Sequence, residues 1–470
     1  MAGRYDLIIV GMGSGGMVAA ELAATLGLRV AVVERDRVGG DCLWTGCVPS
    51  KALLASAKAA HVMRHADRYG LTPIDEPIDT APVFARVRAI QAAIAAADDN
   101  ASRFQAQGIE FHWGAARLTA PTRVRVGDST EIEGRFILLC TGSRPSVPPI
   151  AGLDEAGFLT SETLWERERA PASLVTIGGG PIAIELAQAF VRLGTATTVL
   201  QRGSRILPRD EPELVDTLAA RLREEGVVLE LDVQIDRVSV EEGMKIVHGR
   251  GSQGPRSWRT EEILVAAGRT PNIDGLGLEQ LGIEVNQRGV VVDDRLRTTV
   301  RSISAAGDLA GRHLFTHSAG FEAARAVRNM FFPGSSDGAF IVPWCTFTDP
   351  ELAHIGLTAA QAREEHAAGD VHVWRHDLRH SDRARAESAG DGAITIVTAK
   401  GRIVGAHALA SAAGELINEL ALAIHGKLKL SELASVVHVY PTLSIAIQQL
   451  AGEAGYAKAQ RLKWLTWVAR

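Results

Sequence analysis

Cysteine is scarce in this chain, with only four among 470 residues, namely Cys42, Cys47, Cys140 and Cys345. Small secreted domains that depend on disulfides carry cysteine at a far higher density. The scarcity excludes a disulfide framework, so a bond between Cys42 and Cys47 is expected to be catalytic rather than structural. We interpret Cys140 and Cys345 as structural residues of apolar, strand-like segments.

Long apolar runs and an excess of basic charge are also missing. No stretch reaches about 18 consecutive apolar residues, the length of a membrane-spanning helix. The net charge is -5, which gives no overall basic footprint for nucleic acid. With 46% hydrophobic and 22% charged residues, the composition is that of a globular protein. We therefore expect a cytoplasmic protein of roughly two to four domains that binds neither membrane nor nucleic acid.

What is present begins with a glycine-rich turn. The stretch "YDLIIVGMGSGGMVAAELAATLGLRVAVVERD" predicts a strand, a tight turn, a helix and a second strand, and Gly11, Gly13 and Gly16 form a G-x-G-x-x-G pattern in the turn. Glycine lets the backbone approach a pyrophosphate, whose charge the helix N-terminus attracts. Glu34 closes the second strand, where a carboxylate can accept hydrogen bonds from ribose hydroxyls. The pattern predicts a dinucleotide site.

The same plan recurs in "SLVTIGGGPIAIELAQAFVRLGTATTVLQRGSR". Its turn carries Gly178, Gly180 and Ala183. Its second strand ends in Gln201, where a site for NAD would have an acid, and Arg202 and Arg205 follow. Cationic side chains suit the 2′-phosphate of NADPH, which we expect in preference to NADH. The alternative is that both arginines are solvated loop residues.

Two nucleotide sites in one chain suggest a flavin and a nicotinamide. A hydride would then pass from NADPH to FAD, and electrons would move on to a nearby acceptor. The candidate acceptor is the pair Cys42 and Cys47 in "GGDCLWTGCVPSK". This segment is expected to start a helix, whose N-terminus lowers the pKa of a thiol. Four intervening residues would place the sulfurs about one helical turn apart, close enough to bridge.

Six motifs, in this order along nearly the whole chain, resemble those of the class I pyridine nucleotide–disulfide oxidoreductases, which include dihydrolipoamide dehydrogenase, glutathione reductase and mercuric reductase. They are "GGDCLWTGCVPSK", "FILLCTGSRP" with Gly142, "EILVAAGRTPN" with Gly268, "ISAAGDLAG" with Asp308, "THSAGFEAARAV" and "PWCTFTDPELAHIGLT". The resemblance places Asp308 at the ribityl chain of the flavin.

The resemblance also implies roles for individual residues. Cys47 would be the flavin-proximal sulfur, and Cys42 the interchange sulfur that attacks the substrate. Lys51 and Glu185 match a pair that lies beside the flavin N5 and stabilises its negative charge. No metal site is expected.

The implied fold class is α/β, with two Rossmann-like dinucleotide-binding domains, for FAD and NADPH, and a C-terminal α+β dimerisation domain. The expected domains are 1–150 and 271–340 for FAD, 151–270 for NADPH, and 341–470 for the dimer interface. Between the two nucleotide units, residues 79–108 read as one long helix. The family forms homodimers in which the C-terminal stretch of one subunit completes the site of the other.

The sequence departs from the family near its C-terminus. Disulfide-reducing members carry H-x-H-P-T followed by a glutamate, and the second histidine is the acid–base group. In "HVYPTLSIA", His438 matches the first histidine, Tyr440 replaces the second, and Ile445 replaces the glutamate. A free tyrosine has a pKa of about 10 against about 6.5 for histidine, so Tyr440 is a poor general base.

The missing dyad favours substrates that need little acid–base help. One class is an unusual low-molecular-weight disulfide whose leaving sulfur is acidic or relaxes to a thione. Another is Hg(II), held by two thiolates. We rank the disulfide first, because the tail "GYAKAQRLKWLTWVAR" lacks the cysteine pair with which mercuric reductases deliver the metal.

Two further readings stay open. A quinone or a similar acceptor could take electrons without using the cysteines. The chain could also be a flavoprotein with a sensing rather than an enzymatic role. Trp44, where the family often has asparagine, either shields the disulfide face or serves packing alone.

Overall fold

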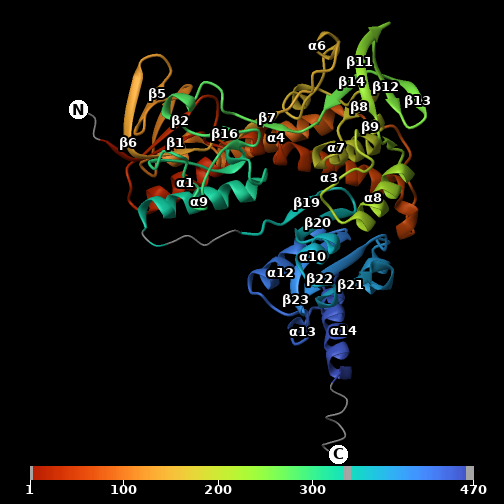
Figure 1. The fold of residues 1–470 in the computed structure, drawn as a ribbon. Helices are drawn as coiled ribbons and strands as arrows, with labels where there is room; N and C mark the ends of the chain where they lie inside the picture. Colours follow the sequence, from red (N-terminus) through yellow and green to blue (C-terminus); the bar gives the residue numbers. More distant parts are fainter. Residues whose placement is uncertain (1–3, 333, 335–339, 462–470) are drawn as a thin grey trace, which may run out of the picture. The chain divides into compact units, whose positions relative to one another are not determined.

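A computed structural model describes residues 4–332, 334 and 340–461 (Figure 1). The chain divides into two compact units, each built from separate stretches of sequence. The first comprises Met1–Leu53, Asp79–Ala170 and Ile263–Phe340, and the second Leu54–Ile78, Pro171–Glu262 and Ile341–Arg470. One helix, α3 (Cys47–Arg64), runs from the first unit into the second. The end of the cysteine-free tail lies outside the described residues.

A sheet with the strand order β3-β2-β1-β6-β5-β4 forms the centre of the first unit, and β18 also pairs with β6. These strands are β1 (Tyr5–Val10), β2 (Val30–Glu34), β3 (Glu110–Trp113), β4 (Ala116–Ala120), β5 (Arg123–Val126), β6 (Thr130–Leu139) and β18 (Ile303–Ala305). The pairs among β1, β2, β3, β6 and β18 are parallel, whereas β4, β5 and β6 pair antiparallel. Carboxyl ends of parallel strands therefore gather at one edge, where α/β proteins place their ligands.

Two helices of the first unit, α1 (Ser14–Thr25) and α9 (Thr316–Phe331), lie side by side (Figure 1). Both contribute alanines to one core, Ala20 and Ala23 from α1 and Ala323 and Ala326 from α9. Small side chains permit a close approach of helices. The packing brings a segment from the C-terminal third of the unit beside its first helix.

The remaining helices and strands of the first unit are short, apart from α4. They are α2 (Gly40–Trp44), α4 (Ala81–Ala97), α5 (Ala101–Gln105), α6 (Leu153–Ala156), the antiparallel pair β7 (Ser143–Pro145) and β15 (Arg269–Pro271), and the hairpin β16 (Val285–Asn286) and β17 (Gly289–Val290). The single helix predicted for residues 79–108 is wrong. It is interrupted before Asn100, whose side chain accepts a hydrogen bond from the backbone N–H of Arg103 and so caps α5.

The middle stretch of the second unit, Pro171–Glu262, contains the parallel strands β8 (Ser173–Ile177), β9 (Ala196–Leu200) and β10 (Val228–Glu230). Two amphipathic helices, α7 (Pro181–Arg192) and α8 (Pro212–Glu224), follow β8 and β9. An antiparallel sheet of β11 (Gln234–Glu241), β12 (Met244–Gly251) and β13 (Gly254–Thr260) comes next, and β14 (Glu262–Val265) returns the chain to the first unit.

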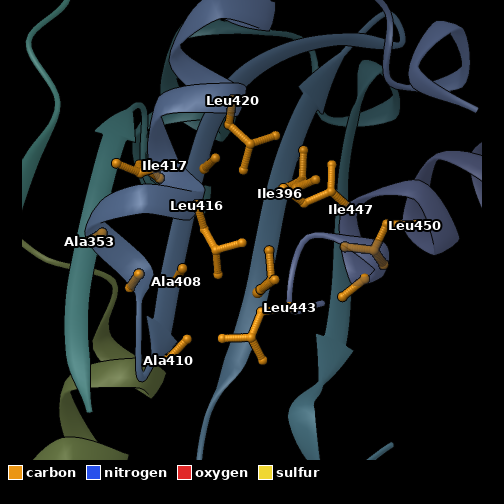
Figure 2. Close-up of a cluster of buried hydrophobic side chains, with 14 of the residues drawn as sticks. Ala353, Ile396, Ala408, Ala410, Leu416, Ile417, Leu420, Leu443, Ile447 and Leu450 are labelled. Atoms are coloured by element: carbon orange, nitrogen blue, oxygen red, sulfur yellow. The ribbon is translucent and has the colours of Figure 1, made fainter. Parts of the chain in front are cut away.

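The C-terminal part of the second unit is a five-stranded antiparallel sheet with the order β19-β20-β23-β22-β21. The strands are β19 (Trp344–Thr346), β20 (Glu351–Gly356), β21 (Val371–Asp377), β22 (Ala393–Ala399) and β23 (Arg402–Ala410), and the helices are α10 (Ala359–Glu365), α11 (Asp382–Ala386), α12 (Ala413–His425), α13 (Leu430–Leu433) and α14 (Ile445–Arg461). Figure 2 shows Leu420 of α12, Ile396 of β22 and Leu450 of α14 in one cluster, and all three are fully buried. Burying a leucine or isoleucine contributes about 1.5–3 kcal/mol, so this cluster fixes α12 and α14 on the sheet.

The predicted fold class is confirmed by these sheets: parallel β-α-β segments follow both glycine-rich turns, and an antiparallel α+β region ends the chain. None of the helices in the described part of the chain combines the length and apolarity that a membrane span requires.

Candidate active site

The first glycine-rich turn joins β1 to α1 and leaves no room for side chains at two positions. Gly11 has φ +96°, and a Cβ on it would lie 2.4 Å from the carbonyl oxygen of Cys140. A Cβ on Gly16 would lie 1.9 Å from the carbonyl oxygen of Gly11. Gly13 precedes the first residue of α1. The turn therefore offers bare backbone and a helix N-terminus, which fits a dinucleotide pyrophosphate.

Glu34 ends β2 and is nearly buried beside this turn. Its Oε2 accepts a hydrogen bond from the backbone N–H of Met12 at 2.7 Å, and its Oε1 accepts from the N–H of Asp36 at 2.9 Å. The carboxylate thus holds the glycine turn against the end of the neighbouring strand. This is the position from which the sequence predicted a contact with a ribose.

Asp308 lies in a polar cluster of the first unit. It accepts a hydrogen bond from the Ser143 hydroxyl at 2.5 Å, and its carboxylate lies 3.5 Å from Nε of Arg269. Burial raises the pKa of Asp308, while Ser143 and Arg269 oppose that rise. Arg269 also pairs with Asp41 at 3.0 Å, and Asp41 is the residue directly before Cys42.

Sequence reasoning missed Arg269, although it directly follows Gly268 in a motif already quoted. Gly142 and Gly268 both have positive φ, +68° and +136°, and both precede strands of the β7–β15 pair. The two glycines thus position the strands that carry Ser143 and Arg269.

The two cysteines lie at a break between two helices rather than within one. Cys42 belongs to α2, whereas Cys47 is the first residue of α3, and Thr45 and Gly46 separate the helices. The expected helix start is present at Cys47, but the expectation that both cysteines lie about one turn apart on the same helix is wrong. In a continuous helix, residues five apart are related by a rise of about 7.5 Å and a rotation of about 140°. Their Cα atoms would then be too far apart for a disulfide, so the break is what brings the sulfurs together.

The two thiols form a hydrogen-bonded pair with opposite pKa shifts. The hydrogen bond from Cys42 lowers the pKa of Cys47 to about 6, with further help from Thr316 and from the charge of Lys51, against the effect of burial. The same hydrogen bond raises the pKa of Cys42, and burial adds to that rise. Near neutral pH the pair therefore shares one proton, with the negative charge on Cys47.

Two hydroxyl groups at helix starts contact this pair, and neither was predicted. Thr316 opens α9, and its Oγ1 lies 3.3 Å from Sγ of Cys47. Ser14 opens α1, and its hydrogen bond to Cys42 partly offsets the rise in the pKa of that thiol. Thr316 belongs to a quoted motif, but no spacing in the sequence indicated a contact across 269 positions.

Lys51 lies on α3, one turn after Cys47, and its positive charge lowers the pKa of that thiol. Glu185 lies on α7, is buried, and accepts a hydrogen bond from the backbone N–H of Phe347 at 2.8 Å. Lys51 and Glu185 belong to different units, so their pairing stays a prediction.

Trp44 has contacts that account for its packing. Its indole N–H donates to the carbonyl oxygen of Val38 at 2.8 Å, and the guanidinium of Arg37 lies 4.1 Å from its ring centre. These contacts favour a packing role within the segment that precedes the cysteines.

The second glycine turn joins β8 to α7. Gly178 has φ +120°, Gly180 caps α7, and Ala183 is fully buried. Beyond β9, Arg202 is exposed, while Arg205 lies 3.5 Å from Asp216 on α8. The turn has the form of a nucleotide site, and one of the two expected phosphate ligands already has an acidic neighbour.

Tyr440 is 65% exposed, and its hydroxyl donates to Oδ2 of Asp382, at the start of α11, at 2.8 Å. The hydrogen bond to Asp382 and the charge of that carboxylate raise the pKa of Tyr440. The phenol is therefore an even weaker acid than its type suggests, its ionised form is rarer still near neutral pH, and its hydrogen bond is already directed to Asp382.

His438 is engaged through both ring nitrogens. Its Nε2 lies 2.8 Å from Oε1 of Glu419 on α12, and its Nδ1 lies 3.0 Å from the carbonyl oxygen of Val436. Ile445, which stands where the family has glutamate, is the first residue of α14. Sequence reasoning missed Asp382 and Glu419. Within the described residues, no group of three or more histidine, cysteine or acidic side chains could hold a metal ion.

Two family models match the chain. Residues 5–326 match the model described as "Pyridine nucleotide-disulphide oxidoreductase", and residues 342–451 match its dimerisation domain. Among curated relatives, a mercuric reductase of Streptomyces lividans is 34% identical, with 86% of both chains covered. A dihydrolipoyl dehydrogenase of Chlorobaculum tepidum is 31% identical, with 97% of this chain and 98% of the relative covered.

One curated relative is longer. A mercuric reductase of Bacillus cereus is 32% identical over 86% of this chain, which spans only 64% of the relative. Among solved structures, the Cu(II) complex of the HOCl-induced flavoprotein disulfide reductase RclA from Escherichia coli has a TM-score of 0.83 and 28% identity, with 96% of this chain and 99% of that one covered.

Proposed function

Because this chain belongs to the pyridine nucleotide–disulphide oxidoreductase family, we propose that it uses NADPH and FAD to reduce a small soft electrophile through Cys42 and Cys47. The first candidate is a low-molecular-weight disulfide whose leaving sulfur needs little acid catalysis. The observation that carries the proposal is the placement of Cys42 and Cys47 at the α2–α3 break, where Oγ1 of Thr316 lies 3.3 Å from Sγ of Cys47 and the pKa of Cys47 is lowered.

The family binds FAD and a pyridine nucleotide. We propose that FAD is held by the first glycine turn, Glu34 and Asp308, and that NADPH is held by the second turn with Arg202 and Arg205. When bound, FAD supplies two-electron transfer from the reduced nicotinamide to the Cys42–Cys47 disulfide. Lys51 would stabilise negative charge there, and Glu185 would orient Lys51.

In the first step Cys47 is the base for Cys42, and this proton transfer costs free energy because the pKa of Cys42 is raised and that of Cys47 is lowered. Once its proton has moved to Cys47, Cys42 attacks one sulfur of the substrate; an S–S bond to Cys42 forms, the substrate S–S bond breaks, and one thiolate leaves. That thiolate takes the proton from Cys47, which then attacks Cys42 and releases the second thiolate. The resulting disulfide receives a hydride equivalent from NADPH, which restores one thiol and one thiolate. The sum is NADPH plus RSSR giving NADP⁺, RSH and RS⁻.

The leaving group decides which disulfides react. Ordinary alkyl thiols have a pKa of about 8.5, so their departure is helped by an acid. The phenol of Tyr440 donates to Asp382 instead, and both nitrogens of His438 are engaged. The Cys47 thiol supplies a proton to the first thiolate that leaves. A second leaving sulfur that is acidic, or that relaxes to a thione, needs no further acid.

Hg(II) is the second candidate, favoured by the mercuric reductase relatives. Two thiolates are good ligands for a soft metal, and binding would release the shared proton. Reduction to the metal would take two electrons from NADPH. No acid is required in these reaction steps. This agrees with the hydrogen bonds that Tyr440 and His438 already make to other groups.

An acceptor screen tests this function. We expect NADPH oxidation to be fast with pyridyl disulfides, whose leaving sulfur becomes a thione, and at least tenfold slower with glutathione disulfide or cystine. The assay includes HgCl₂ and benzoquinones, and each acceptor is run with NADPH and NADH. A preference for NADPH of tenfold or more is expected from Arg202 and Arg205. Equal rates with both classes of disulfide, or turnover with quinones alone, would contradict the proposal.

The charge on Cys47 gives a pH prediction. In the two-electron-reduced enzyme, the long-wavelength absorbance of a thiolate beside flavin is expected to appear as pH rises through about 6, because the pKa of Cys47 is lowered to about 6. Thr316→Val removes a hydrogen bond that stabilises the thiolate, so the midpoint should rise by roughly half to one pH unit. Ser318→Ala is the matched control, since the Ser318 hydroxyl donates to backbone carbonyls of the same region. An unchanged midpoint in Thr316→Val would contradict this assignment.

The match to the dimerisation domain supports a homodimer, and we propose that His438 and Tyr440 of one subunit complete the site of the other. We also propose the domain division 1–150, 151–270, 271–340 and 341–470. A reducing compartment such as the cytoplasm suits free thiols of this kind.

A further inference from the structure

The break between α2 and α3 leaves backbone carbonyl groups without helical partners. In α2, the carbonyl oxygen of Asp41 accepts from the N–H groups of both Thr45 and Gly46. The carbonyl of Gly46 is the first acceptor of α3, bonded to the N–H of Ser50 at 3.2 Å. Of the four carbonyls between Asp41 and Gly46, those of residues 43, 44 and 45 receive side-chain donors.

Two buried side chains from elsewhere in the first unit supply those donors. Nε2 of Gln91, on α4, donates to the carbonyl oxygens of Leu43 at 3.2 Å and Trp44 at 2.7 Å. Nε1 of Trp165 donates to the carbonyl oxygen of Thr45 at 2.9 Å, a bond it shares with that of Ser161. All three orphan carbonyls therefore have a side-chain N–H partner.

Because these donors are buried, they are the partners of these carbonyls in place of water. Gln91 and Trp165 are each only 6% exposed, so water cannot readily replace them. The bond to the Leu43 carbonyl is buried and the bonds to the Trp44 and Thr45 carbonyls are partly buried. A carbonyl that loses its donor in such a place is costly, so we expect the segment between α2 and α3 to change conformation until the carbonyl has a new partner. The most direct rearrangement extends one of the helices through residues 45 and 46, which would carry Cys47 away from Cys42.

We propose that Gln91 and Trp165 are positioning residues that hold the α2–α3 break open and so keep Cys47 within bonding distance of Cys42. Their hydrogen bonds go to backbone carbonyl groups. By fixing the backbone, Gln91 and Trp165 raise the effective concentration of the Cys47 thiol near Cys42. A higher effective concentration favours the disulfide over the dithiol. This inference rests on the proposed role of the two cysteines as a redox pair.

The test is the thiol–disulfide equilibrium of the FAD-containing enzyme against mixtures of reduced and oxidised dithiothreitol, without NADPH. The fraction of Cys42–Cys47 disulfide is read by mass spectrometry after alkylation. Gln91→Leu and Trp165→Phe are each expected to lower the equilibrium constant for disulfide formation about tenfold, equivalent to a rise of about 30 mV in reduction potential.

Gln188→Leu is the matched control. Gln188 is a buried glutamine of the second unit, and its Nε2 donates to the carbonyl oxygen of Asp349 at 2.9 Å. The control should lower the melting temperature without moving the equilibrium constant. If Gln91→Leu does not fold, Gln91→Met and Trp165→Phe give the same readout.

The outcomes separate this inference from the proposed function. Equilibrium constants of the Gln91 and Trp165 variants within twofold of the parent, with a melting loss like that of Gln188→Leu, would overturn the positioning role alone. If the parent enzyme forms no Cys42–Cys47 disulfide in any dithiothreitol mixture, the proposed function fails as well.

Discussion

Cys42→Ser is expected to lower kcat/KM for NADPH-driven reduction of pyridyl disulfides or Hg(II) by a thousandfold or more. Losing the attacking atom of a covalent mechanism has effects on this order. A serine hydroxyl forms neither a mixed disulfide nor a soft-metal bond. The substitution also removes the thiol that donates to Cys47, which is the largest cause of the lowered pKa of Cys47.

The readout distinguishes the dithiol route from direct transfer to quinones. A quinone that bypasses the cysteines would be reduced by Cys42→Ser at an unchanged rate, while the disulfide and Hg(II) activities disappear. Cys345→Ser is the matched control, because Cys345 lies in β19 of the second unit, where its Sγ donates to the carbonyl oxygen of Thr346 at 3.6 Å. Full activity of Cys42→Ser with every acceptor would remove the dithiol mechanism.

The sequence predicted those parts of the site whose residues belong to one continuous segment of the chain. The turn of Gly11 and Gly16 and the acid Glu34 belong to one β-α-β segment, so strand, turn and helix signals alone place them together. The same holds for the second turn at Gly178. In these segments, residues that are close in sequence are also close in space. The spacing of apolar side chains along the sequence predicts which residues form strands and which form helices.

Contacts between distant segments could not be predicted in this way. Thr316 reaches Cys47 because α9 packs beside α1, which no single-segment pattern encodes. The arrangement of Arg269 with Asp41 and Asp308 likewise depends on how three separate segments fold together. Packing of this kind is decided by tertiary complementarity and not by local propensity.

Helix breaks were the other failure, and here a signal was available. Gly46 lies between the two cysteines, and Asn100 lies within the stretch read as one long helix. Glycine weakens a helix interior and asparagine favours an N-cap, so both residues mark the interruptions that the structure shows. The prediction gave more weight to the periodic apolar residues on both sides of Gly46 and Asn100 than to these two residues.

The loss of the acid–base dyad is the sequence inference that the structure develops furthest. Tyr440 and Ile445 showed only that the expected groups are missing. The structure adds that Asp382 accepts the phenol proton and that Glu419 engages His438. A carboxylate therefore lies beside the end of the side chain at position 440.

Tyr440→His is accordingly expected to create activity toward ordinary aliphatic disulfides. General acid catalysis contributes about a hundredfold to ten-thousandfold, so kcat/KM for glutathione disulfide should rise by about a hundredfold. An imidazolium can protonate the departing thiolate, and Asp382, now 2.8 Å from the phenol oxygen, can hold the ring. Adding Ile445→Glu should increase the gain further, since it restores the second member of the family dyad.

The pH dependence identifies the cause of such a gain. An acid acts in its protonated form, so the gain should be full below the pKa of the new histidine, about 6.5 in the absence of neighbours, and fall as pH rises through it. Asp382 should move that pKa upward, because a nearby carboxylate favours the charged ring. Tyr456→His, which places the same residue at an exposed position of α14, is the matched control and should leave the rates unchanged. No gain with any disulfide in Tyr440→His, alone or with Ile445→Glu, would show that substrate choice is set by something other than the missing acid.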